Sequence, residues 1–166
     1  SKNAYALIDL DNNIIAMKNW QRVCTDFHRN NETSRISCLE SDNIIKTHLE
    51  KGKSFGYRCK NGLMDYAIPI IVNEEHIATL FFGQVFTEEP NIDFFKEQAK
   101  KYDFNEEEYI KAVKEVPIIS TEESVSIVSF FIEIASFISS LCEEKIKNLD
   151  FQKREVVTAE ELENSN

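Results

Sequence analysis

The chain has 166 residues, a formal net charge of −10, 42% hydrophobic residues and twelve phenylalanines. This content is enough to build one folded core, so it excludes a chain that is disordered throughout, and the length fits a single domain. The acidic excess argues against a nucleic-acid-binding surface within these residues, because phosphate neutralisation requires clustered Lys and Arg.

The first third of the chain has the pattern of short strands with two helices between them. Alternating apolar residues and turn signals predict strands over 4–10 and 14–17, a helix over 20–28, a loop over 29–34, a helix from 41 to about 50 and a strand over 54–59. Ser41 and Asp42 are residue types that favour a helix N-cap, so the second helix is expected to begin there.

A β-hairpin is predicted in the middle of the chain, with strands over 64–72 and 76–86 and a polar turn at 73–75. Strict alternation places two sets of side chains on opposite faces of the second strand. One set is Ala78, Leu80, Phe82, Gln84 and Phe86, and the other is Ile77, Thr79, Phe81, Gly83 and Val85. A glutamine buried among aromatic side chains needs a hydrogen-bond partner, and a small polar ligand is one candidate.

The last part of the chain is helical in pattern, with helices predicted over about 92–102, from 105 to before Pro117, and over about 122–149. The long helix carries an apolar row with coiled-coil spacing, which predicts a homodimer. That row is Ile127, Phe131, Ile134, Ile138 and Leu141. Glu133 lies in the middle of the apolar stretch, so a buried or dimerising helix is favoured over a membrane span. Residues 150–166 are expected to form a charged tail or linker.

Together these elements predict an α+β domain over residues 1–149. Its sheet is expected to be PAS-like, five-stranded and antiparallel, with helices on one face and a long C-terminal helix. The N-terminus shows no signal-peptide pattern and the four cysteines show no tight pairing, so a cytoplasmic protein with reduced thiols is expected.

A pocket is predicted at the open end of the central hairpin. Antiparallel pairing brings Asp65 and Tyr66 roughly opposite Phe82 and Gln84, and Tyr57 and Cys59 border the same floor. Aromatic walls with a few fixed polar groups are typical of small-molecule sites. The alternative is that Asp65 caps a turn and Gln84 satisfies a backbone group.

A second constellation contains cysteine and histidine. Cys24 and His28 are four residues apart on a predicted helix, and Cys38 and Cys59 could join them as metal ligands. The spacing is loose and there is no Cys-x-x-Cys, so small apolar core cysteines are the favoured interpretation. We assign no metal, no cofactor and no catalytic residue.

Several separated stretches together resemble the PocR family of prokaryotic sensory domains. They are WQRVCTDFHR at 20–29, CLESD at 38–42, YRCKNGL at 57–63, Asp65, AIPI at 67–70, Gly83-Gln84 and Val116-Pro117. The likeness covers roughly residues 5–145. In this family Cys24, His28, Cys38 and Cys59 match positions that are commonly Cys or His. Many members carry a further Cys three residues before Cys38, where this chain has Arg35.

The resemblance implies a non-enzymatic, PAS-like ligand-binding domain in signal transduction. Such domains are fused to histidine kinases or AraC-type DNA-binding regions and are thought to sense small hydrocarbon derivatives such as propanediol or glycerol. The ligand-binding residues it suggests here are Trp20, Cys24, Tyr57, Cys59, Asp65, Tyr66, Phe82 and Gln84. A cysteine-based redox or metal sensor is the alternative function.

Overall fold

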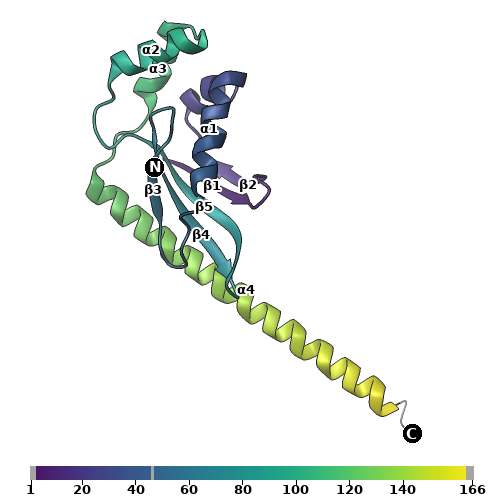
Figure 1. Ribbon diagram of the computed structural model, residues 1–166. Coiled ribbons are helices and arrows are strands. Elements are labelled where there is room, and N and C mark those ends of the chain that lie inside the picture. Colours follow the sequence, from purple (N-terminus) through teal and green to yellow (C-terminus); the bar gives the residue numbers. More distant parts are fainter. Residues whose placement is uncertain (1–2, 46, 164–166) are drawn as a thin grey trace.

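The computed structural model describes residues 3–45 and 47–163 and contains a five-stranded antiparallel sheet in the order β2-β1-β5-β4-β3 (Figure 1). The strands are β1 (Ala4–Asp9), β2 (Ile14–Lys18), β3 (Phe55–Arg58), β4 (Met64–Val72) and β5 (Glu75–Val85). The predicted five-stranded antiparallel sheet is therefore confirmed.

The turn between β4 and β5 has only two residues, because Glu75 already belongs to β5. Asn73 and Glu74 have φ values of 48° and 68°. Two consecutive positive φ values are the geometry of a type I′ turn, whose twist matches that of the flanking strands. The turn fixes the register of the two longest strands, and it places the start of β4 beside the end of β5.

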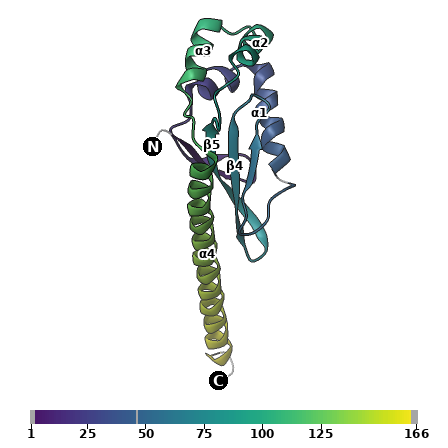
Figure 2. The same ribbon diagram turned by 90° about the vertical axis from the view of Figure 1, so that its left-hand side faces the viewer.

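Helices cover both faces of the sheet and one of its ends. They are the short π-helix η1 (Val23–His28), α1 (Glu32–Ile45), α2 (Ile92–Tyr102), α3 (Glu106–Glu115) and α4 (Thr121–Glu163). Figure 2 shows the sheet between α1 and α4, with α2 and α3 beyond one end of the strands. The α2 bounds agree with the sequence pattern, and α3 ends before Pro117 as predicted.

The N-terminal helices differ from the prediction. The side chain of Asn31 accepts hydrogen bonds from the backbone N–H groups of Thr33 and Ser34 at 3.0 and 2.9 Å, so α1 begins at Glu32 rather than at Ser41. The residues predicted as a loop therefore include the first turn of α1. Ser41 lies inside the helix, where its hydroxyl donates to the carbonyl oxygen of Ser37.

The long helix α4 continues to Glu163, so the predicted end near residue 149 is wrong. No Gly or Pro interrupts residues 150–163, and charged residues alone do not stop a helix. By length and composition, α4 is the one described helix that could cross a membrane. Part of its apolar surface is the stripe that packs on the sheet, where Val128 and Ala135 are buried.

The predicted apolar row on α4 is also wrong in part. Phe131 and Ile138 pack against the sheet with Ile68 and Ile70. The apolar side chains on the solvent side are instead Phe130 and Phe137, which are 63% and 64% exposed, and Leu141. The helix carries apolar residues on more than one side, and periodicity alone does not tell which side faces the sheet.

Candidate functional site

A β-bulge near the end of β5 builds the candidate site. Asp65 pairs with Gly83 and Met64 pairs with Val85, so Gln84 is an extra residue between them, with a φ of 52°. Such a bulge interrupts the alternation of side chains and re-aims the residue it adds. Gln84 consequently shares a cavity with Gly83, whereas strict alternation had placed it on the face of Phe82.

Hydrogen bonds at both ends of Gln84 hold the bulge. Its backbone N–H donates to Oδ1 of Asp65 at 2.9 Å, and its side-chain oxygen accepts the backbone N–H of Gln21 at 2.6 Å. The second bond ties the end of β5 to the residues that lead into η1. Asp65 and Gln84 thus bind backbone groups, as in the interpretation that gives them structural roles. Both residues nevertheless line a cavity.

Gly83 is required for this close approach. A Cβ atom on Gly83 would lie 2.6 Å from Cα of Asp65 and 2.8 Å from the carbonyl oxygen of Met64. Both are backbone atoms and cannot move aside cheaply. The absence of a side chain at residue 83 therefore lets the Asp65 side chain lie against β5 at the cavity floor.

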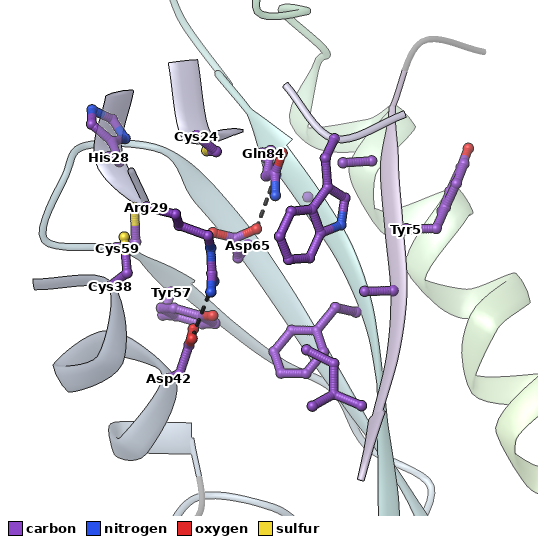
Figure 3. Close-up of a pocket in the computed structure, with 16 residues that line it drawn as sticks. Tyr5, Cys24, His28, Arg29, Cys38, Asp42, Tyr57, Cys59, Asp65 and Gln84 are labelled. Carbon is purple, nitrogen blue, oxygen red and sulfur yellow. Dashed lines mark hydrogen bonds and ion pairs between the residues drawn. The ribbon is translucent and has the colours of Figure 1, made fainter. Parts of the chain in front are cut away.

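The cavity has a volume of about 50 Å³ and lies between the sheet and the layer formed by η1 and α1 (Figure 3). Its lining includes six of the eight residues suggested as ligand contacts. These six are Trp20, Cys24, Tyr57, Cys59, Asp65 and Gln84. The volume is small beside the several hundred Å³ of a drug-sized pocket, which limits an occupant to a few non-hydrogen atoms.

The other two suggested contacts, Tyr66 and Phe82, do not line this cavity. Tyr66 directly follows Asp65 on β4, and Phe82 directly precedes Gly83 on β5. Neighbouring side chains on a strand point to opposite faces of the sheet, so Tyr66 and Phe82 face α4. Phe82 is fully buried and stacks on Tyr66 and Phe131 with ring centroids 5.7 and 6.1 Å apart. Tyr66 and Phe82 were suggested as ligand contacts on the assumption that side chains alternate regularly along β5. The bulge instead places Gln84 on the other face of the sheet from these two residues.

Asp65 carries the most perturbed carboxyl of the site. Burial raises its pKa to about 7, although the hydrogen bond from Gln84 acts in the opposite direction. Within the described part of the chain Asp65 has no ion pair, since the nearby guanidinium of Arg29 contacts Asp42 at 3.2 Å. One oxygen of Asp65 accepts the Gln84 N–H, so the other can bind a donor in the cavity.

Two further polar groups face the same space. Burial raises the pKa of the Tyr57 hydroxyl far above its ordinary value, so it remains a protonated donor and acceptor. The carboxamide of Gln84 uses its oxygen for Gln21, which leaves its amino group as a donor. Asp65, Tyr57 and Gln84 therefore combine acceptors and donors around one small volume.

Three cysteines line the cavity, and of these Cys24 and Cys38 are buried and Cys59 is partly buried. Burial raises the pKa of Cys24 and of Cys38, and raises that of Cys59 to about 12. The sulfur of Cys38 accepts a hydrogen bond from the Asn61 amide at 3.2 Å. Thiols with raised pKa values are poor nucleophiles and poor metal ligands, because both roles need the thiolate.

His28 has a structural partner. Its Nε2 lies 2.7 Å from the hydroxyl of Tyr109, which donates its hydrogen to Gln98. Nε2 of His28 is consequently the donor in this chain of bonds. Burial lowers the pKa of His28 to about 4, so the ring is neutral at pH 7. Among the described residues, no group of three or more His, Cys, Asp or Glu side chains is arranged to hold a metal ion.

Arg29 and Asp42 are cavity residues that sequence reasoning did not select. Their ion pair closes the cavity on the side of α1, and the Arg29 guanidinium lies 4.9 Å from the ring centroid of Trp20 (Figure 3). Both residues lie inside stretches that carry the family resemblance. Their opposite charges, 13 residues apart, gave no signal, because the predicted loop and helix boundaries between them were wrong.

Comparison with known protein families gives a match over most of the chain. A family model described as the sensory domain found in PocR matches residues 2–143. No curated protein and no solved structure gives a significant match to the chain. The matched region contains the sheet, the bulge and every residue of the cavity. The chain belongs to the PocR family of sensory domains, and its role is sensory.

Proposed function

We propose that this domain binds a small hydrocarbon derivative, such as a short diol or alcohol, in the cavity beneath η1 and α1. The observation that supports this best is the Asp65 carboxyl, which is partly buried at the cavity, has no ion pair among the described residues and lies beside two further polar groups. A ligand hydroxyl would donate to Asp65 and accept from Gln84 or Tyr57. The domain senses its ligand and carries out no catalysis.

The size of the cavity sets the affinity. A ligand with five non-hydrogen atoms gains at most about 7 kcal/mol, which corresponds to a Kd in the micromolar range at the tightest. Asp65 and Gln84 would supply selectivity, because an occupant without a hydroxyl leaves them unpaired. A sensor of an abundant small metabolite needs no tighter binding.

A direct structural route leads from the cavity to α4. Two residues after Gln84, the backbone N–H of Phe86 donates to the carbonyl oxygen of Pro117, and Ile119 donates back to Phe86, both at 2.9 Å. These bonds hold the segment that enters α4. A ligand that changes the position of the bulge would thereby favour one arrangement of the start of α4 over another.

In this proposal the domain is a homodimer whose two copies contact each other through α4, and the ligand acts on that contact. Phe130, Phe137 and Leu141 form an exposed row on the side away from the sheet, at spacings of seven and four residues. This spacing suits a parallel coiled-coil contact. We propose that α4 leads to a histidine kinase or transcriptional-regulator output in the cytoplasm, and that this domain contacts neither nucleic acid nor membrane.

The second candidate function, a cysteine-based redox or metal sensor, gains less support. The raised pKa values of Cys24, Cys38 and Cys59 and the engagement of His28 with Tyr109 favour structural roles. Elemental analysis of the purified domain tests it. A stoichiometric metal that is lost on Cys24→Ser would favour this function over ligand sensing.

Thermal-shift measurements with short diols, alcohols and amines test the proposal. At one hundred times its Kd, a ligand stabilises the folded protein by about 2.7 kcal/mol, which raises Tm by about 5–10 °C for a chain of this size. Tyr57→Phe should weaken binding, whereas Tyr66→Phe, the same change on the other face of the sheet, should not. No shift with any compound, in a folded protein, would refute ligand sensing.

A further inference from the structure

A second and larger cavity adjoins the first on the same face of the sheet. It has a volume of about 230 Å³. Most of its wall is apolar and comes from β1, α1 and the turn after α1, and includes Ile8, Leu39, Ile45 and Leu49. Neither the family match nor the ligand contacts suggested by sequence assign it a role.

The two cavities share one wall. Ile8 and Phe81 contribute to it from the sheet, and Arg29 and Asp42 from the helical layer, and all four residues line both cavities. The ion pair has a contact of 3.2 Å, and its side chains are 31% and 26% exposed. A partly exposed pair of this kind contributes little to stability, so it can part without a large cost.

Three of the polar side chains around the second cavity, those of Asp9, His76 and Thr79, already have hydrogen-bond partners. Oδ1 of Asp9 accepts the backbone N–H groups of Asp11 and Asn13, and Nε2 of His76 lies 2.9 Å from the hydroxyl of Thr79. Such groups have little to gain from a polar occupant. An apolar occupant, by contrast, gains from leaving water.

We propose that the two cavities form one elongated ligand site. The hydroxyl-bearing head of the ligand lies against Asp65, and its alkyl chain passes the Arg29–Asp42 pair into the second cavity. The ligand is then a medium-chain 1,2-diol or alcohol rather than a three-carbon one. This inference rests on the proposed function and adds the length of the chain.

A homologous series of 1,2-diols from propanediol to octanediol tests the inference by calorimetric titration. Each methylene that enters the second cavity should tighten Kd about fourfold, the factor that corresponds to about 0.8 kcal/mol per buried CH₂. The gain should stop once the cavity is full. An equal Kd across the series would refute the elongated site while leaving the short-diol proposal intact.

A larger side chain that fills the second cavity tests the inference, and a substitution of similar size to the original residue serves as its control. Thr79 lines the second cavity and not the first, and its side-chain direction is fixed by β5. Thr79→Phe should abolish the tightening of Kd with chain length and leave the Kd of propanediol unchanged. The control Thr79→Val removes the same hydroxyl and should keep the tightening of Kd with chain length. Unchanged chain-length dependence in Thr79→Phe would refute the inference.

A variant on the opposite wall covers the case in which Thr79→Phe does not fold. Leu39→Trp adds bulk from α1 at a position that is 44% exposed and therefore tolerant of change. It should weaken octanediol binding at least tenfold and leave propanediol binding unchanged. Equal weakening of both diols would contradict a separate tail cavity, and no binding by any diol to the wild-type protein would refute the proposed function itself.

Discussion

Replacing Asp65 with asparagine should stabilise the ligand-free domain in a pH-dependent way. Asparagine has the same shape and keeps an oxygen to accept the Gln84 N–H, but it has no charge to bury. The pKa of Asp65 is raised from 3.8 to about 7 in the folded protein. A difference of about 3 pH units corresponds to about 4 kcal/mol of free energy of unfolding.

The sign follows from which state holds the proton. Between pH 4 and pH 7 the folded wild-type protein keeps the Asp65 proton and the unfolded chain has lost it, so this group makes the wild type less stable as the pH rises. Above pH 7 both states are ionised and the effect levels off. The stability advantage of Asp65→Asn over the wild type should therefore grow by about 1.4 kcal/mol per pH unit up to pH 7.

Urea unfolding of both proteins at pH 5, 6, 7 and 8 measures this difference, since effects of the other titrating groups cancel between them. Asp150→Asn, an exposed change on α4, is the control for the loss of one negative charge. A difference between wild type and Asp65→Asn that stays constant from pH 5 to pH 8 would refute a raised pKa of the Asp65 carboxyl in the folded protein.

Three further changes test other parts of the structure. Gly83→Ala should lower the free energy of unfolding by about 2 kcal/mol in urea titrations, because its Cβ would overlap the Asp65 and Met64 backbone; a neutral effect would contradict the bulge geometry. The pKa of His28 is lowered to about 4 in the folded protein, so the unfolded chain takes up this proton first as the pH falls. The free energy of unfolding of the wild type should therefore fall by about 2 kcal/mol from pH 6.5 to pH 5. His28→Gln should remove that loss in the same titrations, and an unchanged pH slope would argue against a buried neutral ring. Phe137→Glu should convert the proposed dimer to monomer in light scattering while Ser129→Glu does not, and an unchanged mass for Phe137→Glu would rule out the α4 row as the interface.

The sequence predicted the sheet because its signals are local. Alternating apolar residues and turn residues set the limits of β4 and β5, and Asn91 and Pro117 mark helix boundaries in the way general rules describe. α1 was misplaced because Ser41 and Asp42 favour an N-cap by residue type, whereas in the folded chain Asn31 provides the cap.

The site was predicted in part, and the errors have one main cause. A bulge cannot be read from alternation, so the sequence placed Gln84 beside Phe82 and included two residues of the opposite face. Gly83 before Gln84 was the one available hint, since a glycine inside a strand often marks a bulge. The Arg29–Asp42 pair depends on tertiary packing between η1 and α1, which no local pattern encodes.

The most direct test of the central claim uses Trp20, the single tryptophan of the chain, which lines the cavity. Its indole N–H signal in ¹H–¹⁵N NMR spectra should shift saturably as a 1,2-diol is added. At pH 8 the Asp65 carboxyl, with its pKa of about 7, is ionised. A hydrogen bond to a charged partner contributes about 1.5–3 kcal/mol, so at this pH Asp65→Asn should need a roughly 10- to 100-fold higher concentration for the same shift. A diol that raises Tm but leaves the Trp20 signal unchanged, or that binds Asp65→Asn as tightly as wild type, would contradict the placement of the ligand in this cavity.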